Sequence, residues 1–281
     1  MVALQEVLLA QERRDLPWRR TRDPWAVLVS EVMLQQTQVR RVVPRWTAFL
    51  QRFPTPAACA GAAVGHVVAE WAGLGYNRRA VALHGAASAC VQRHGGALPA
   101  TLAELVALPG VGPYTARAVL AFSYEQDVGV VDVNAARVLA RAVAGRRLSA
   151  REAQEVADAS VPPGAGWAWN QAVLDLGATT CRRTAPACGA CPVAGACAWR
   201  SGDGPDPAGA ATRQTPFAGS DRQGRGRLLT ALVAGPVRAD LVASASGWPG
   251  DEARSARVAA SLVAHGLARW DHTEPRTLRL P

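Results

Sequence analysis

The chain has 281 residues, enough for one large or two modest domains with a core in each. Its formal net charge of +9 is typical of a protein with a polyanionic partner, nucleic acid first, although an arginine-rich, high-GC composition would give the same excess. No apolar run reaches the roughly 18 residues of a membrane span, and residues 1–14 lack the apolar core of a signal peptide, so we expect a cytoplasmic protein without a membrane partner.

The basic residues are all of one kind. All 31 are arginine, and the chain contains no lysine. No lysine side chain can therefore form a Schiff base with a sugar aldehyde.

From Leu4 to about Arg200 the sequence predicts a succession of amphipathic helices with hardly any alternating strand pattern, which indicates an all-α fold. Asp23 and Pro24 make a good helix start. The apolar residues that follow fall on one helical face: Trp25, Leu28, Val29, Val32 and Met33. Glu31 lies at the edge of this face, where a carboxylate can be partly desolvated and fit for proton transfer. The alternative is a plain solvated glutamate.

A helical hairpin is predicted in the middle of the chain. Residues Thr101–Glu104 form a capping box for a short helix that must stop at Pro109, and Pro113 lies in the first turn of the next helix. Between them, Gly110 and Gly112 allow close approach of a partner, and the first amides of the second helix can bind a phosphate. An ordinary helix-loop-helix corner is the alternative.

Four of the six cysteines cluster with a spacing that indicates a metal site. They are Cys181, Cys188, Cys191 and Cys197, separated by six, two and five residues. Four cysteine thiolates can hold an iron-sulfur cluster or a tetrahedral zinc ion. Cys59 and Cys90 stand alone in alanine-rich helical stretches, where a small buried thiol is the expected role.

Residues 201–221, rich in glycine and proline, predict a linker, and residues 222–281 a small C-terminal domain. Helices are predicted at 227–234, 239–244 and 254–268, followed by short strands at 268–270 and 277–280. Three helices closing on a β-hairpin indicate a winged-helix-like module. A helical cap without a binding role is the alternative.

The cysteine spacing, the stretch Leu108–Ala116 and Asp132 together resemble the helix-hairpin-helix DNA glycosylases that contain an iron-sulfur cluster. Further motifs are similar to those of the MutY-type adenine DNA glycosylases, which correct adenine mispaired with 8-oxoguanine or guanine. These motifs are Pro17–Arg20, Ser30–Val39, Trp71–Tyr76, Trp169–Ala172 and Asp175–Gly177. The resemblance covers about residues 10–200.

The resemblance implies a two-lobed glycosylase domain over residues 1–200, with a 4Fe-4S cluster in the loop 181–197. It implies a monomer that acts on double-stranded DNA containing an adenine mismatch and is associated with the nucleoid. Relatives that also cut the DNA backbone have a lysine where this chain has Tyr114. Together with the absence of lysine, Tyr114 predicts a monofunctional glycosylase that removes the base and leaves the strand intact.

By resemblance, Glu31 protonates the adenine ring and then activates the water that completes the reaction. Asp132 stays ionised and opposes the positive charge that develops on the sugar, as one of the paired carboxylates of a glycoside hydrolase does. Tyr114 and Asn134 match positions that orient these two carboxylates.

Other positions match family residues that contact DNA. Gln36, Leu74 and Tyr76 would prop the duplex open when the adenine is rotated out. Trp18 and Arg19 would line the adenine pocket with a contribution from Asp175. Gly110 and Gly112 would bring the hairpin backbone to a phosphate.

Two alternatives remain open at this stage. Thymine or uracil mismatch glycosylases share the scaffold, the hairpin and the cluster, but they commonly lack a glutamate equivalent to Glu31. A non-catalytic iron-sulfur DNA-binding protein is the second alternative. In addition, residues 222–281 are shorter and of different character than the strand-rich Nudix-like domain of many relatives.

Overall fold

The computed structural model describes residues 1–202, 204–208 and 216–281, and contacts between residues divide it into two units. The first unit contains Met1–Leu28, Ala100–Val106 and the described residues from 111 to 208. The second contains Val29–Pro99, Ala107–Gly110 and residues 216–281. Residues 203 and 209–215 of the predicted linker lie outside the described residues.

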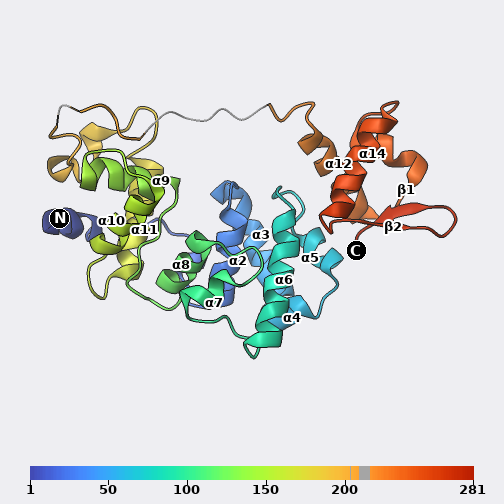
Figure 1. Ribbon diagram of the computed structural model, residues 1–281, viewed down its shortest axis with the longest axis horizontal. Coiled ribbons are helices and arrows are strands. Elements are labelled where there is room, and N and C mark those ends of the chain that lie inside the picture. The colour runs from blue at the N-terminus through green and yellow to red at the C-terminus, as the bar shows by residue number, and fades with distance from the viewer. Residues whose placement is uncertain (203, 209–215) are drawn as a thin grey trace. The chain divides into compact units, whose positions relative to one another are not determined.

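The predicted all-α fold is confirmed, since no strand begins before residue 237 in the described part of the chain (Figure 1). The helical elements of the first unit are α1 (Val2–Leu9), η1 (Pro17–Arg19), α7 (Leu102–Val106), α8 (Pro113–Phe122), α9 (Val133–Val138), the π-helical η2 (Leu139–Ala144), α10 (Ala150–Ser160), α11 (Gly166–Thr179), η3 (Cys188–Ala190) and η4 (Ala194–Ala196). Helix α2 (Pro24–Leu34) begins in the first unit and ends in the second. None of the described helices combines the length and apolar content needed to cross a membrane.

The elements of the second unit are helical up to β1. They are α3 (Val39–Arg52), α4 (Pro56–Ala60), α5 (Val64–Glu70), α6 (Arg78–Arg93), α12 (Asp221–Ala234), β1 (Val237–Arg238), η5 (Ala239–Leu241), α13 (Val242–Ser246), α14 (Glu252–Ala264), β2 (Arg269–Asp271) and β3 (Thr277–Arg279).

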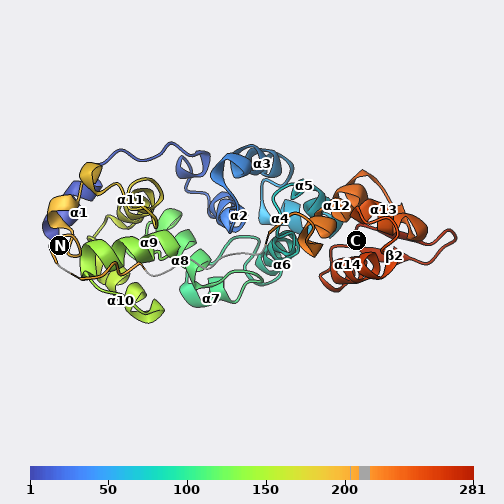
Figure 2. The same cartoon turned by 90° about the horizontal axis from the view of Figure 1, so that it is seen from above.

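In the first unit, α1, α9 and α11 share one hydrophobic core (Figure 2). Leu8 of α1 and Trp169 of α11 are almost completely buried there, beside Val138 of α9. Val193, from the segment that holds the cysteines, belongs to the same core. The cysteine loop is therefore anchored on the helices that support α9.

Helix α2 starts where the sequence predicts, because the backbone N–H of Trp25 donates to the Asp23 carboxylate at 3.0 Å. The predicted one-sided apolar stripe is wrong in one respect. Every residue from 25 to 33 is buried, so α2 is enclosed on all sides. Glu31, expected at the edge of the stripe, is only 6% exposed.

The hairpin also forms as predicted, with α7 ending before Pro109 and α8 starting at Pro113. The N–H of Glu104 donates to the Thr101 hydroxyl at 3.4 Å. Gly110 has φ +74°, and a Cβ there would lie 2.6 Å from the Cβ of Ala82 in α6. Only glycine fits this position, because both the backbone conformation and the close packing exclude a side chain.

The second unit has an aromatic core in its helical part. Phe49 packs edge to face on Phe53 and Trp71, with ring centroids 5.0 and 6.1 Å apart. Helices α4 and α5 pack against α6.

The C-terminal segment has the predicted three helices and the hairpin β2–β3, which extends into an antiparallel sheet of order β1-β3-β2. Strand β1 was not predicted, because two residues give no alternating pattern. Helix α12 begins at Asp221, earlier than predicted. Its first half was missed because it is rich in glycine and arginine and shows no apolar pattern. Helix α14 ends at Ala264 rather than 268, where Gly266 adopts φ +65°.

This segment packs onto the helical part of the same unit. The N–H of Gly65, in α5, donates to the carbonyl oxygen of Pro281 at 3.2 Å, and Figure 1 shows the C-terminus beside α5. A Cβ on Gly65 would lie 2.4 Å from that oxygen. Gly266 lies close to Val81 of α6. The C-terminal segment thus meets α5 through a backbone hydrogen bond that leaves no room for a side chain at Gly65, and it meets α6 at the Val81 side chain.

Candidate functional site

Asp132 is fixed at the N-terminus of α9 by hydrogen bonds to both of its carboxylate oxygens. Oδ1 accepts from the backbone N–H groups of Asn134 and Ala135 at 2.8 and 2.7 Å, and Oδ2 accepts from the Asn134 side chain at 2.8 Å. The side chain is half-buried. The contacts and the helix N-terminus together suit a negative charge held in one orientation.

Arg137 connects this carboxylate with the cysteine loop. Its guanidinium donates to the Asn134 side-chain oxygen at 2.9 Å, to the Gly177 carbonyl at 2.7 Å and to the Cys181 carbonyl at 2.7 Å. A Cβ on Gly177 would lie 2.8 Å from the Cβ of Asn134, so α11 and α9 touch at this point. The sequence analysis predicted roles for Asp132 and Asn134 but none for Arg137.

Tyr114 lies in the first turn of α8, half-buried. Gly112, just before it, is exposed and has an ordinary φ of −90°, and a Cβ there would meet no atom within 4 Å. The fold therefore requires glycine at Gly110 but not at Gly112.

In the second unit, Gln36 and Tyr76 are both in the left-handed backbone region, with φ of +55° and +48°. Tyr76 is 47% exposed and Gln36 is exposed too, whereas Leu74 is buried. Two non-glycine residues in this region indicate loops that the surrounding structure holds in place.

Arg79 is the residue that holds these loops, and the sequence analysis missed it. Its guanidinium donates to the carbonyls of Val32, Met33, Gln35 and Gly75 at 2.7 to 2.9 Å and to the Thr37 hydroxyl at 3.0 Å. It also lies over the rings of Trp71 and Tyr76. Burial lowers the pKa of Arg79 to about 10. The Arg79 side chain thus donates hydrogen bonds to carbonyl groups at the end of α2 and connects the loop of Gln36 with the loop of Tyr76.

Arg19 and Asp175, both expected near the base, form a buried ion pair with each other. The two guanidinium nitrogens of Arg19 donate to the two carboxylate oxygens at 2.7 and 2.8 Å, and Arg14 donates to the same carboxylate. Burial alone would raise the pKa of Asp175, but the hydrogen bonds from Arg19 and Arg14 bring it below its usual value. Trp18 is also buried. A contact of these residues with DNA remains a prediction.

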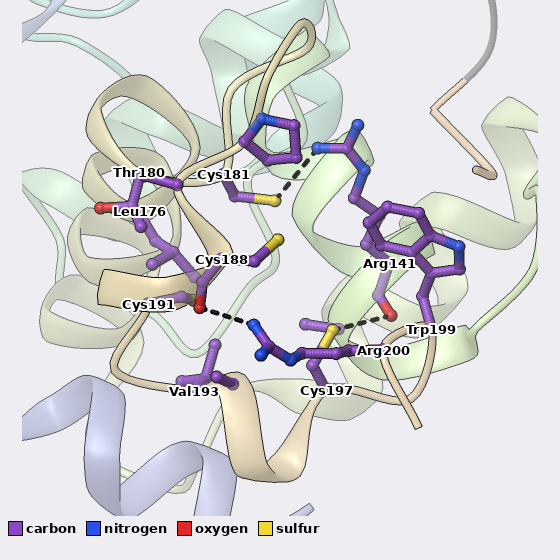
Figure 3. A pocket seen from close by; sticks show the side chains of 14 residues that line it. Arg141, Leu176, Thr180, Cys181, Cys188, Cys191, Val193, Cys197, Trp199 and Arg200 are labelled. Carbon is purple, nitrogen blue, oxygen red and sulfur yellow. Dashed lines mark hydrogen bonds between the residues drawn. The ribbon is translucent and has the colours of Figure 1, made fainter. Parts of the chain in front are cut away.

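The four clustered cysteines line one pocket, together with Arg141, Leu176, Trp199 and Arg200 (Figure 3). Arg141 is 1% exposed and pairs with both oxygens of Asp206 at 2.8 and 2.5 Å. It also donates to the carbonyls of Arg182 and Arg183 and lies 3.5 Å from the Cys181 sulfur. The loop is thus folded around the buried Arg141. Its partners in the loop lie at least 40 residues away along the chain, so no local sequence pattern indicates these contacts.

Within the described residues, no group of three or more cysteine, histidine or acidic side chains is gathered around one metal-ion position. The four thiols line the wall of the pocket instead. Cys59 and Cys90 lie apart, and burial raises their pKa values to about 12 and about 11. These two are inert core thiols, as predicted.

Known proteins with a similar sequence or fold indicate the class of protein to which this chain belongs. Residues 29–163 match a family model described as "HhH-GPD superfamily base excision DNA repair protein". In structure, a thermostable thymine-DNA glycosylase is similar with a TM-score of 0.66 and 26% identity, over 71% of this chain and 96% of that one. An endonuclease III–DNA covalent intermediate has the same fold, with a TM-score of 0.57 and 21% identity, over 64% of this chain and 85% of that one.

Sequence relatives narrow the class. The adenine DNA glycosylase of Mycolicibacterium smegmatis is 42% identical over 260 residues, which cover 91% of this chain and 88% of that protein. The human adenine DNA glycosylase is 42% identical over 201 residues, 66% of this chain and 37% of the human protein. The chain belongs to the adenine DNA glycosylase family of the HhH-GPD superfamily, as its motifs predict.

Proposed function

We propose that this protein is a monofunctional adenine DNA glycosylase of base excision repair, acting as a monomer on adenine mispaired with 8-oxoguanine or guanine in double-stranded DNA. The observation that supports the proposal is the 42% identity to adenine DNA glycosylases along most of both chains. The net charge of +9, supplied by arginine alone, suits a phosphate backbone as partner.

In this proposal Glu31 is the general acid and Asp132 the stabilising carboxylate. Glu31 donates a proton to the leaving adenine and then accepts one from the attacking water. Asp132, held by the N–H groups of Asn134 and Ala135, opposes the positive charge that grows on the sugar. Its fixed orientation suits this role, because a preorganised charge need not reorient during the reaction. Tyr114 and Asn134 position the two carboxylates.

The DNA contacts are proposed for three groups of residues. Gln36, Leu74 and Tyr76 hold the duplex open at the mispair, while Trp18, Arg19 and Asp175 shape the pocket for the extruded base. The hairpin glycines Gly110 and Gly112 let the backbone approach a phosphate. Gly112 supports this assignment, because neither backbone conformation nor packing requires glycine there.

The cysteine loop is proposed to bind a 4Fe-4S cluster through Cys181, Cys188, Cys191 and Cys197. Thiols that line a pocket without meeting at one point suit a group of several atoms better than a single zinc ion. When bound, the cluster would crosslink the loop through its thiolates. Iron and sulfide analysis of the purified protein, with zinc measured in parallel, tests this assignment.

We also propose three domain limits: a glycosylase domain over residues 1–200, a linker over 201–221 and a small domain over 222–281. The three helices and the sheet of the last segment support the third limit, since they pack on one another and Leu228, Leu262 and Leu278 are completely buried.

Base release from a panel of duplexes tests the activity. Each of the four bases is placed opposite guanine and opposite 8-oxoguanine, and the released bases are quantified. We expect adenine release alone. The likeness to a thymine-DNA glycosylase gives the second candidate, and release of thymine opposite guanine with no adenine release would favour it. Binding to every duplex with no release would indicate a non-catalytic protein.

A further inference from the structure

The second unit contains a cluster of basic side chains that none of the proposed roles uses. We infer that Arg78 of α6, Arg225 of α12 and His265 at the end of α14 form a binding site for a phosphate of the DNA backbone. The inference rests on the proposed function, because it takes DNA as the ligand.

Arg225 and His265 are in direct contact. The Arg225 guanidinium donates to Nδ1 of His265 at 3.0 Å, which requires that nitrogen to be unprotonated and leaves the imidazole neutral. Burial and the charge of Arg78 both lower the pKa of Arg225. Burial and the charges of Arg225 and Arg78 do the same for His265. The positive charge of Arg78 thus acts on both members of the Arg225–His265 contact.

In the described part of the chain, no carboxylate forms an ion pair with this cluster. None of the ion pairs among the described residues includes Arg78, Arg225 or His265. Other arginines of the C-terminal segment do have acidic partners, as in the pairs Arg238–Asp240, Arg254–Asp221 and Arg279–Asp271. The dipole at the C-terminal end of α14 offsets part of the repulsion between these positive charges, but it supplies no counter-ion. A bound anion would supply the missing negative charge.

Contacts between the C-terminal segment and the helices α5 and α6 hold the elements of this cluster together. The bond from Gly65 to Pro281 and the approach of Gly266 to Val81 attach the C-terminal segment to α5 and α6. Arg78 is exposed at the first position of α6, two residues after the exposed Tyr76. If Tyr76 contacts an opened base pair, a phosphate of the same duplex lies within reach of Arg78, and guanidinium groups bind phosphate with charge-assisted hydrogen bonds.

The test compares Arg78→Gln and Arg225→Gln with a control, Arg238→Gln, which removes the same charge and lies in the same C-terminal segment as Arg225. The full-length proteins bind a duplex in which 8-oxoguanine faces a non-cleavable adenosine analogue, over a series of salt concentrations. For each cluster variant we expect weaker binding at low salt and a slope of log affinity against log salt that is smaller by about 0.9, the value for one lost phosphate contact. Arg238→Gln should keep the wild-type slope.

Wild-type slopes in both cluster variants would overturn the site, provided that wild-type protein releases adenine. If wild-type protein released no adenine, the proposed function would fail instead. Inorganic phosphate distinguishes the source of the ligand. Phosphate could stabilise wild-type protein against unfolding but not Arg225→Gln, while the salt dependence of DNA binding is the same in both. That result would mean that the site binds free phosphate and not DNA. Arg257 lies on the exposed face of α14, outside the cluster. A reduced slope for Arg257→Gln would also overturn the proposed site if the cluster variants kept the wild-type slope.

Discussion

In the proposed mechanism Asp132 has two tasks, capping α9 and supplying a negative charge, and one substitution separates them. Asparagine caps a helix about as well as aspartate, so Asp132→Asn should preserve α9 while removing the charge that the proposed reaction needs. We expect both Asp132→Asn and Glu31→Gln to lower the single-turnover rate of adenine release by at least about 100-fold, the range for loss of an electrostatic stabiliser or of an acid-base group.

Duplex binding by these variants should remain close to wild type, as measured with a non-cleavable substrate. Glu155→Gln is the matched control, since Glu155 is an exposed glutamate on α10 with only a loose pair to Arg151. A variant at Glu31 or Asp132 that released adenine at the control's rate would contradict the assigned roles.

The pair between Arg19 and Asp175 gives a prediction about stability. Asp175→Asn leaves the buried Arg19 without its counter-charge, which typically costs about 3–5 kcal/mol. Urea unfolding at neutral pH measures this loss. Because the pKa of Asp175 is lowered in the folded state, the stability that it contributes is present above the usual aspartate pKa and is lost as the pH falls through the lowered value. The difference between wild type and Asp175→Asn should therefore shrink in acid; a constant difference at every pH would contradict this account.

At the scale of elements, the end of α2 and the loop before α6 depend on one guanidinium. Arg79→Met leaves several carbonyls without a donor, so the Gln36 and Tyr76 loops should lose their left-handed conformations. We expect slower opening of the duplex, monitored by the fluorescence of 2-aminopurine beside the mispair.

Arg79→Lys should restore part of that rate, because an ammonium reaches some of the same carbonyls but lacks the fork of the guanidinium. Arg93→Met, at the exposed far end of α6, removes the same charge and should behave as wild type. Equal rates in Arg79→Met and Arg93→Met would exclude a role of Arg79 in shaping these loops.

Features encoded in a short stretch of sequence were predictable. The start of α2 at Asp23, the capping of α7 by Thr101 and the turn at Gly110 all follow from neighbouring residues. Arg79 and Arg141 were not predictable, because each makes bonds to carbonyl oxygens more than 40 residues away along the chain, as Arg79 does to Val32 and Arg141 to Arg182.

Glu31 and Asp132 belong to different units, so no spacing rule relates them, and only the family resemblance suggested them as a pair. The burial of α2 on all sides was missed as well, because its pattern of polar and apolar residues indicated a helix with one apolar face.

For the whole molecule, the absence of lysine has a chemical consequence. Borohydride traps a protein on DNA only when an amine has formed a Schiff base with the opened sugar, and no side chain here offers one. We expect no trapped complex after adenine release and a strand that breaks only on heating in alkali. Acetylation of the N-terminal amine is the control. Enzymatic nicking that persisted after acetylation would contradict the lysine argument.

The contacts of Arg79 also bear on the thermodynamics of recognition. A loop that becomes ordered only when DNA arrives loses conformational entropy at that step, roughly 1–2 kcal/mol for each residue fixed. Here Gln36 and Tyr76 already have left-handed conformations in the free protein, where Arg79 of α6 donates to the adjacent carbonyls of Gln35 and Gly75. That ordering belongs to folding rather than to binding, so in the proposed complex the two residues would meet the duplex as a preformed surface.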